Sequence, residues 1–406
     1  MDLREKRDGL LGLDLCDRCL GRQFAMLGHG LENYERGAIA RTVDDLDEDS
    51  FVDRNVADPD PSGESCPFCK GLFKDVEGYV ERVVRALEPY EIRTLLMGTR
   101  LPDDVVEVEE RIWGDYGNEF AEPTKTELNR LVGREVQTRL GIEGDFERPD
   151  INAILDLKED RVELRVNSSL YHGRYNKYAR GIPQTIWYCK ECRGSGCEEC
   201  GYTGKKYQES VQEIIQKPFL EEADAEDATF HGAGREDIDA RCFGRREFVL
   251  ELHHPKKREI DLDRIQREIN EDQSKVELFS IKQTGKDKVE EVKQKRADKT
   301  YRALVKLSGD ISEDGMQGVK EIQGTVRQRT PNRVAHRRAD MVREREVRWI
   351  RVEEVCRGVL EISVRAEAGT YIKELISGDE GRTNPSVAGK LGCQAKCEKL
   401  DVLDID

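Results

Sequence analysis

Paired cysteines constrain the fold of this chain more than any other feature of its sequence. Eight of the 12 cysteines fall into Cys-x2-Cys pairs: Cys16/Cys19, Cys66/Cys69, Cys189/Cys192 and Cys197/Cys200. Such a turn presents two thiolates to one ion, and two turns complete the tetrahedral site that structural zinc prefers. Disulfides are the alternative, but they are typical of short secreted scaffolds, whereas this chain has 406 residues. The pairs therefore predict metal binding, with zinc as the metal.

The four pairs form two groups. If the pairs at 16/19 and 66/69 share one zinc, the acidic segment between them is an insertion held at its base by metal. The other four cysteines lie within twelve residues, in a stretch whose Gly194 and Gly196 permit tight turns. Similar octads occur in DnaJ-type chaperones, but this sequence has no His-Pro-Asp tripeptide to mark a J domain. Whether the second group holds metal stays open.

Charge is distributed unevenly along the chain. The formal net charge of -16 argues by itself against a polyanionic partner. Basic residues nevertheless gather in "VRQRTPNRVAHRRADMVREREVR" near the carboxyl end. Such a stretch can be a solvated face, but its surplus of arginine favours phosphate binding and keeps RNA as a partner. The donors that we expect to contact phosphate are Arg327, Arg329, Arg333, Arg337 and Arg338.

Several classes of protein are disfavoured by what the sequence lacks. No window approaches the roughly 18 unbroken apolar residues of a membrane helix, so we expect no membrane partner. The amino terminus, "MDLREKRDGLLGLDLC", lacks the apolar core and cleavage site of a secretory signal, and we expect a cytoplasmic protein. Neither G-x-G-x-x-G after a strand nor G-x-x-x-x-G-K-[ST] is present, so we expect no nucleotide or other organic cofactor. Nothing in the sequence bears on the oligomeric state, and a monomer is the expectation.

The region after the first cysteine group mixes helix and strand. Valines from Val76 to Val84 and Leu87 form a helical stripe, and the run "VVEVEERI" at 105–112 alternates apolar and polar residues. Residues 124–141 predict another helix, with Thr124 or Thr126 as its cap. "INAILDLKEDRVELRV" predicts two strands around the turn "KED". Together with "GRY", this pattern resembles a divergent THUMP domain, an RNA-binding module of tRNA-modifying enzymes.

From Phe248 onward the pattern predicts an α+β domain built on antiparallel sheet. "FVLELHHP", "VELFSI", "TYRALVKLSG" and "WIRVEEVCRGVLEISVRAEAGTYI" predict strands, and "EIDLDRIQREI" predicts an amphipathic helix. Just ahead of the first strand, "HGAGREDIDAR" places charged residues behind a Gly-Ala-Gly turn. By itself this stretch fits a polar loop with local ion pairs better than a catalytic loop.

Three motifs, in the expected chain order, resemble those of the pseudouridine synthases. They favour a catalytic loop over a polar loop. "GREDID" resembles their catalytic loop, which would make Asp237 the essential aspartate and Arg235 its neighbour. "KTYRALV" resembles the second motif and would place Tyr301 beside the target base. "AGTYIKEL" resembles the third and would make Lys373 the basic partner of Asp237, where several subfamilies carry arginine. Leu391, further along, resembles the apolar residue that packs under the active site.

With the amino-terminal cysteine pairs and the THUMP-like region, the whole chain resembles the archaeal and eukaryotic family that makes pseudouridine in the TΨC arm of tRNA. The resemblance implies that position 54, position 55 or both are modified. It also implies three parts: a zinc-binding region at 1–72, a THUMP-like domain at 73–172 and a pseudouridine synthase domain at 173–406. The alternative is a non-catalytic zinc and THUMP tRNA-binding protein or RNA chaperone. A methyltransferase or a tRNA-thiolating enzyme is weaker, because the glycine loops are absent.

Overall fold

The computed structural model describes residues 2–52, 66–356 and 358–406, and of Arg337 only the backbone. Much of the acidic segment between the first two cysteine pairs therefore lies outside the described residues. The chain forms two compact units, Met1–Asn167 with Lys256–Arg258, and Ser168–Pro255 with Glu259–Asp406. Within the described residues, no helix is long and apolar enough to cross a membrane.

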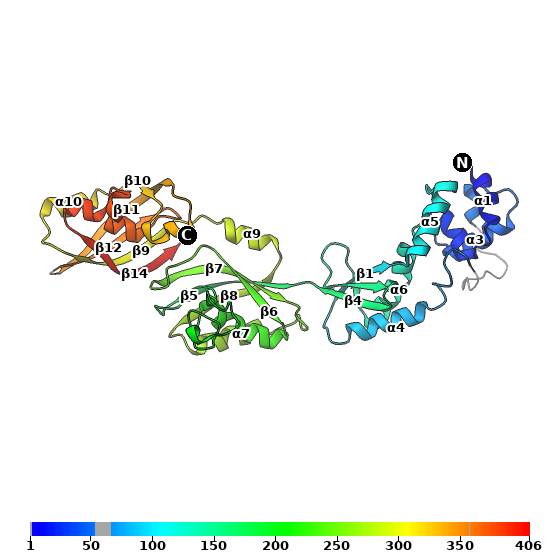
Figure 1. The fold of residues 1–406 in the computed structure, drawn as a ribbon, viewed down its shortest axis with the longest axis horizontal. Helices are drawn as coiled ribbons and strands as arrows, with labels where there is room; N and C mark the ends of the chain where they lie inside the picture. Colours follow the sequence, from blue (N-terminus) through cyan, green and yellow to red (C-terminus); the bar gives the residue numbers. More distant parts are fainter. Residues whose placement is uncertain (1, 53–65, 357) are drawn as a thin grey trace. The chain divides into compact units, whose positions relative to one another are not determined.

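The first unit combines helices with a four-stranded sheet. Its helices are α1 (Leu3–Leu11), α2 (Asp17–Gly21), α3 (Asn33–Thr42), α4 (Val76–Leu87), α5 (Asp103–Tyr116) and α6 (Thr124–Leu140). Its strands are β1 (Thr94–Arg100), β2 (Glu143–Gly144), β3 (Ile151–Asp156) and β4 (Arg161–Val166), in the order β2-β1-β3-β4. Helix α6 packs against β1 and α4, beside the sheet (Figure 1). One buried apolar cluster extends from Leu10 to Leu155.

Most of the elements predicted for this unit are confirmed, and two details are wrong. The valine stripe forms α4, and the "KED" turn joins β3 to β4 in antiparallel register. The run at 105–112, however, lies in helix α5, where Val105, Glu109 and Ile112 are the buried residues. The cap of α6 is Pro123, because Thr124 is already helical and its hydroxyl and amide both donate to Glu109.

The second unit is built on a ten-stranded sheet. Its strands are β5 (Ser169–Lys177), β6 (Asp227–Gly232), β7 (Arg241–His253), β8 (Val276–Thr284), β9 (Lys299–Leu307), β10 (Gly324–Arg329), β11 (Val342–Cys356), β12 (Val359–Ala366), β13 (Thr383–Asn384) and β14 (Ala395–Ile405). The order is β13-β10-β11-β12-β9-β14-β7-β5-β8, with β6 also on β7. Every pairing is antiparallel except that of β14 with β7, which confirms the predicted α+β class and its antiparallel sheet.

The helices of the second unit pack around this sheet. They are α7 (Val211–Ala223), α8 (Leu262–Glu271), α9 (Asp287–Gln294), α10 (Glu313–Lys320), α11 (Ile372–Ser377) and α12 (Val387–Leu391), with short 3-10 turns that include η4 (Asn332–Arg337). Helices α7 and α8 contact β8, and α11 contacts β14.

Strand β7 changes partner along its length, and this opens the sheet. Its first two residues, Arg241 and Cys242, pair with β14, whereas Phe248–His253 pair with β6. The loop 233–240 leaves β6 at Gly232 and enters β7 at Arg241, so it emerges between the two partners. The sequence "AGREDIDA" therefore lies where the sheet divides, and a loop at such a place can reach a cavity between strands.

Candidate active site and metal centres

A cavity of about 880 Å³ opens at this division of the sheet. Its walls come from the loop 233–240, β9, β14, the turn η4 and the start of α11. The lining includes Asp237, Lys299, Tyr301, Arg333 and Lys373. Sites for small ligands and cofactors span about 300–1,000 Å³, so a single nucleotide fits this volume.

The loop 233–240 is supported from beneath by buried charge. Glu236 is buried and forms an ion pair with Arg246, with Nε to Oε2 at 2.9 Å, and Tyr175 donates its hydroxyl to the same carboxylate at 3.0 Å. Lys177 Nζ donates to the carbonyls of Asp237 and Ile238 at 3.2 and 3.1 Å. Removing one partner of such a buried pair is strongly destabilising, so the loop has little freedom. Glu236 thus holds the backbone while its neighbour Asp237 faces the cavity.

The carboxylate of Asp237 lies between two cations. Lys373 Nζ is 3.3 Å from Oδ2, and Arg333 Nη1 is 3.4 Å from Oδ1. Each cation has a second carboxylate at shorter range. Lys373 binds Asp239 at 2.7 Å, and Arg333 Nε donates to Glu374 at 2.6 Å. The side chain of Asp237 stays 33% exposed, so it is accessible to a ligand.

These contacts favour the charged forms of Lys373, Asp239 and Arg333. Burial acts to lower the pKa of Lys373, but the hydrogen bond to Asp239 and the charge of Asp237 outweigh it and raise that pKa. Burial likewise acts to raise the pKa of Asp239, and the hydrogen bond and charge of Lys373 lower it overall. The pKa of Arg333 is raised by Glu374 and Asp237 against the opposing effect of burial. Lys373 and Arg333, the two basic side chains beside Asp237, are thus both protonated at neutral pH.

Strand β9 supplies the floor of the cavity. Tyr301 is buried, and burial raises the pKa of its hydroxyl to about 12, so the side chain is a neutral phenol at pH 7. Lys299 lies two residues earlier, on the same face of the strand. Burial, and then the nearby charge of Arg246, lower the pKa of Lys299 to about 8. The floor therefore offers an aromatic ring and an amine that can lose its proton near physiological pH.

Arg235 and Leu391 occupy different places. The guanidinium of Arg235 lies 4.7 Å from the ring centroid of Trp187, and both residues line the cavity. Leu391 ends helix α12 and is buried in the apolar core that contains Tyr301 and Ile372. It is not among the residues that line the cavity, so its contribution is packing.

The five arginines of the basic stretch have different surroundings. Arg327 and Arg329, on β10, are exposed and line a separate cavity of about 530 Å³ with Arg382. Arg338 donates to the hydroxyl of Tyr371 at 2.9 Å at the rim of the main cavity. Arg333 is bound to Glu374 and Asp237, and the side chain of Arg337 lies outside the described part of the chain.

The first cysteine group forms a closed cage. The Sγ atoms of Cys16, Cys19, Cys66 and Cys69 all lie within 4.8 Å of one another, and all four residues are buried. Cys16 and Cys69 are 3.9 Å apart at sulfur, close to the edge of about 3.8 Å that Zn–S bonds of 2.3 Å give in a tetrahedron. All 12 cysteines of the chain are free thiols. The donor set therefore fits a four-thiolate metal ion.

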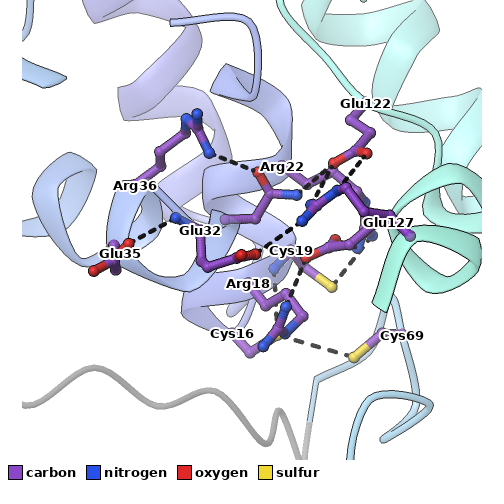
Figure 2. A network of polar contacts seen from close by, with 12 residues as sticks. Cys16, Arg18, Cys19, Arg22, Glu32, Glu35, Arg36, Cys69, Glu122 and Glu127 are labelled. Carbon is purple, nitrogen blue, oxygen red and sulfur yellow. Dashed lines mark hydrogen bonds and ion pairs between the residues drawn. The ribbon is translucent and has the colours of Figure 1, made fainter. Parts of the chain in front are cut away.

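Buried charges connect this cage to helix α6. Arg22 donates to Cys19 Sγ at 3.4 Å and to Glu127 Oε2 at 3.0 Å, and Arg18 donates to Glu127 Oε1 at 2.7 Å. Figure 2 shows Arg18 of α2, Arg22 of the 3-10 turn η1 (Arg22–Phe24) and Glu127 of α6 meeting beside Cys19. The side chains of Arg22 and Glu127 are fully buried. Four thiolates around a divalent ion leave negative charge, which Arg22 beside Cys19 offsets.

The second cysteine group is more open. Cys189, Cys192, Cys197 and Cys200 also lie within 4.8 Å at sulfur, but only Cys189 is buried. Three of the separations are 3.9 Å for Cys189–Cys197, 3.8 Å for Cys192–Cys200 and 3.7 Å for Cys197–Cys200. Amides of Gly196 and Gly204 donate to Cys192 and Cys200 at 3.2 Å, and both glycines have positive φ. This group too fits a metal ion, in a loop that follows the cavity residue Trp187.

Several of these residues were missed in the sequence. Glu374 directly follows the predicted Lys373, but nothing in the motif indicates that it binds Arg333. Glu236, Arg246 and Lys177 read as ordinary charged residues. Arg246 stands between Arg245 and Glu247 ahead of "FVLEL", so no local signal marks it as a buried ion-pair partner.

Comparison with known proteins places the chain in a family. The family described as "Pus10 THUMP domain, archaeal" matches residues 79–156, so the chain is a THUMP-domain protein. The family described as "Pus10, C-terminal" matches residues 171–406. The relative named "tRNA pseudouridine synthase Pus10" from Methanothrix thermoacetophila is 42% identical over 96% of this chain and 91% of its own length. Its namesake from Halorubrum lacusprofundi is 41% identical over 97% and 93%.

The chain belongs to the Pus10 family. Among solved structures, one titled "Crystal Structure of a Cbf5-Nop10-Gar1 Complex" matches 48% of this chain and 45% of that chain, at 23% identity and a TM-score of 0.30. That likeness adds nothing to the family assignment.

Proposed function

We propose that this chain is a tRNA pseudouridine synthase that isomerises uridine in the TΨC arm, at position 54, position 55 or both. The names of its relatives support the activity. The observation that carries it is the carboxylate of Asp237, which lies at a nucleotide-sized cavity with a cation on each oxygen. A carboxylate that is accessible and flanked by two cations suits attack at a sugar carbon.

Asp237 is the proposed catalytic carboxylate. Isomerisation breaks the bond between C1′ and N1, turns the uracil, joins C1′ to C5 and moves the C5 proton to solvent while N1 gains one. The carboxylate either attacks C1′ or removes the C2′ proton to give a glycal. Lys373 and Arg235 are its proposed neighbours at the site, and Lys373 Nζ lies 3.3 Å from its Oδ2. Atoms balance without an oxidant or reductant, so the reaction requires no organic cofactor.

Tyr301 is the proposed platform for the detached base. Its ring lies in the floor of the cavity, where it can stack on uracil. Its hydroxyl remains protonated at neutral pH, since burial raises its pKa to about 12. Stacking is therefore the role proposed for Tyr301, because a neutral phenol is a poor base for removing the C5 proton.

A uridine inside a tRNA arm has to be turned out of its stack before it reaches this cavity. That step costs a few kcal/mol, which contacts to the pocket and to phosphates offset. Arg327, Arg329, Arg337 and Arg338 are the proposed phosphate donors, and the THUMP domain is the proposed second contact with tRNA.

Both cysteine groups are proposed zinc sites. Zinc would supply a structural cross-link, because a closed shell of four thiolates leaves no position for water or substrate. The cysteines at 16, 19, 66 and 69 would then hold a largely polar region together, and those at 189–200 would stiffen the loop after Trp187. The division at residues 72/73 and 172/173 into zinc-binding, THUMP and catalytic regions, a monomeric state and a cytoplasmic location remain proposals.

The proposal is tested by incubating the purified protein with an unmodified tRNA transcript and mapping pseudouridine. Release of tritium from C5-labelled tRNA gives the rate. We expect modification at position 54, 55 or both in wild type and none with Asp237→Asn. Tight binding of tRNA without any pseudouridine would instead support the non-catalytic RNA-binding alternative.

A further inference from the structure

The turn η4 brings an arginine to Oδ1 of Asp237, while Lys373 contacts Oδ2. Its Arg333 lies 96 positions from Asp237 in sequence, and no motif links the two. Arg333 presents Nε and Nη2 to Glu374 at 2.6 and 3.4 Å and Nη1 to Asp237 at 3.4 Å. One planar guanidinium thus contacts two carboxylates through different nitrogens of a rigid fork, whereas Lys373 contacts its two carboxylates through a single nitrogen.

Glu374 fixes the position of this arginine. Its side chain is only 6% exposed, whereas that of Arg333 is 41% exposed. If Arg333 moved away to a phosphate, Glu374 would be left as a buried charge without compensation, which is strongly unfavourable. Glu374 is in turn fixed at the start of α11, where Gln328 of β10 donates to the carbonyl of Tyr371 and accepts from its amide at 2.9 and 2.8 Å. Arg333 is therefore held in place and is a poor phosphate contact.

We infer that Arg333 and Glu374 are a positioning pair for the reaction at Asp237. Glu374 orients Arg333, and Arg333 orients Oδ1 of Asp237, as Asp239 and Lys373 do for Oδ2. Both cations bind their supporting carboxylates at 2.6–2.8 Å and Asp237 at 3.3–3.4 Å. The longer contacts orient the carboxylate of Asp237 and leave its oxygens able to contact a substrate. The inference rests on the proposed function, and it removes Arg333 from the set of phosphate donors.

Arg333→Ala, Glu374→Gln and the double variant test the inference in steady-state assays over a range of tRNA concentrations. We expect each single variant to lower kcat about a hundredfold with KM little changed, because misplacing a reacting group by about 1 Å has that effect. The double variant should be no slower than Arg333→Ala, because both changes break one chain of contacts. Arg333→Ala alone leaves the buried carboxylate of Glu374 unpaired, which destabilises the fold, whereas the double variant removes that carboxylate as well. Arg348→Ala removes a surface ion pair with Asp298 and is the control.

Two further readouts separate positioning from folding and from phosphate binding. Millimolar guanidinium chloride should restore part of the activity of Arg333→Ala, which a purely structural role would not allow. In an Asp237→Asn background, Arg333→Ala should leave tRNA affinity and its salt dependence unchanged. A salt slope lower by about one would make Arg333 a phosphate contact and overturn the inference.

Activity within about twofold of wild type in Arg333→Ala would overturn the inference alone. Absence of pseudouridine with the wild-type protein would overturn the proposed function, and the inference with it. The two failures are distinguishable because the first requires an active wild-type enzyme.

Discussion

The chain contains two networks in which two cations face the two oxygens of one carboxylate, and the two networks differ in burial. Around the first cysteine group, Arg18 and Arg22 bind both oxygens of Glu127, and Arg22 also reaches Cys19. Around Asp237, two cations likewise face the two oxygens of one carboxylate. Glu127, however, is fully buried with contacts of 2.7 and 3.0 Å, whereas Asp237 is one third exposed with contacts of 3.3 and 3.4 Å.

Under the proposed function, this difference separates a structural network from a reactive one. A carboxylate that is saturated and sealed from water has no capacity for a ligand, and it can only stabilise the fold. A carboxylate that is held at longer range and left open can exchange its contacts for a substrate. We therefore predict that substitutions in the network around Glu127 change stability, and that substitutions in the network around Asp237 change turnover.

Removing the first metal should give the largest effect. Cys16→Ser with Cys66→Ser should lose one zinc per chain and unfold the first unit at 25 °C, because structural zinc contributes about 10–16 kcal/mol in small domains. Elemental analysis and circular dichroism measure both. Cys356→Ser, at an exposed cysteine outside the two groups, is the control. Unchanged zinc content in the double variant would contradict the first site, and loss of a second zinc on Cys189→Ser with Cys197→Ser would establish the other.

Asp237→Asn should abolish turnover while leaving the fold and tRNA binding nearly intact. The substitution keeps the shape of the side chain and removes its charge, so we expect a loss of at least about a thousandfold, or about 4 kcal/mol. Tritium release gives the rate, and filter binding gives the affinity. Activity within about tenfold of wild type would remove Asp237 from the catalytic role.

Glu127→Gln should destabilise the first unit and leave kcat at saturating tRNA unchanged. It leaves Arg18 and Arg22 without their shared carboxylate, which we expect to cost about 3–5 kcal/mol. Hydrogen exchange of the amides of α6 measures this locally. Glu135→Gln on the same helix, which breaks an exposed pair with Arg139, should cost less than about 0.5 kcal/mol. Equal effects of the two variants would show that the sealed network is not structural.

Arg327→Ala with Arg329→Ala should have the smallest effect, confined to tRNA affinity. Both side chains are exposed, and each lost phosphate contact should lower the salt slope by about one unit. Binding measured over a range of salt concentrations, with Arg348→Ala as control, tests this. If Arg333→Ala lowered the slope and these two did not, the assignment of reactive and phosphate-binding arginines would be reversed.

Local patterns predicted most elements, and they failed where a tertiary contact competed. The stripe from Val76 to Leu87 was sufficient for α4, because its buried face follows a helical period. The apolar residues of the run at 105–112 fit both a strand period and a helical period. The run is helical because Val105 and Ile112 pack into the core. Thr124 is a good cap in isolation, but Glu109 of α5 takes its hydroxyl and amide instead.

The sequence by itself determined the two cysteine groups and indicated the motif residues Asp237, Tyr301 and Lys373, which line one cavity, because spacing and motif are local properties of the chain. It did not show which charges support them. Arg333, Glu374 and Glu236 gain their roles from partners distant in sequence or on other elements, and the same residue types on a surface would form weak ion pairs. Only the tertiary structure decided which carboxylate is sealed and which is open, because burial and distance depend on how strands far apart in the sequence pack together.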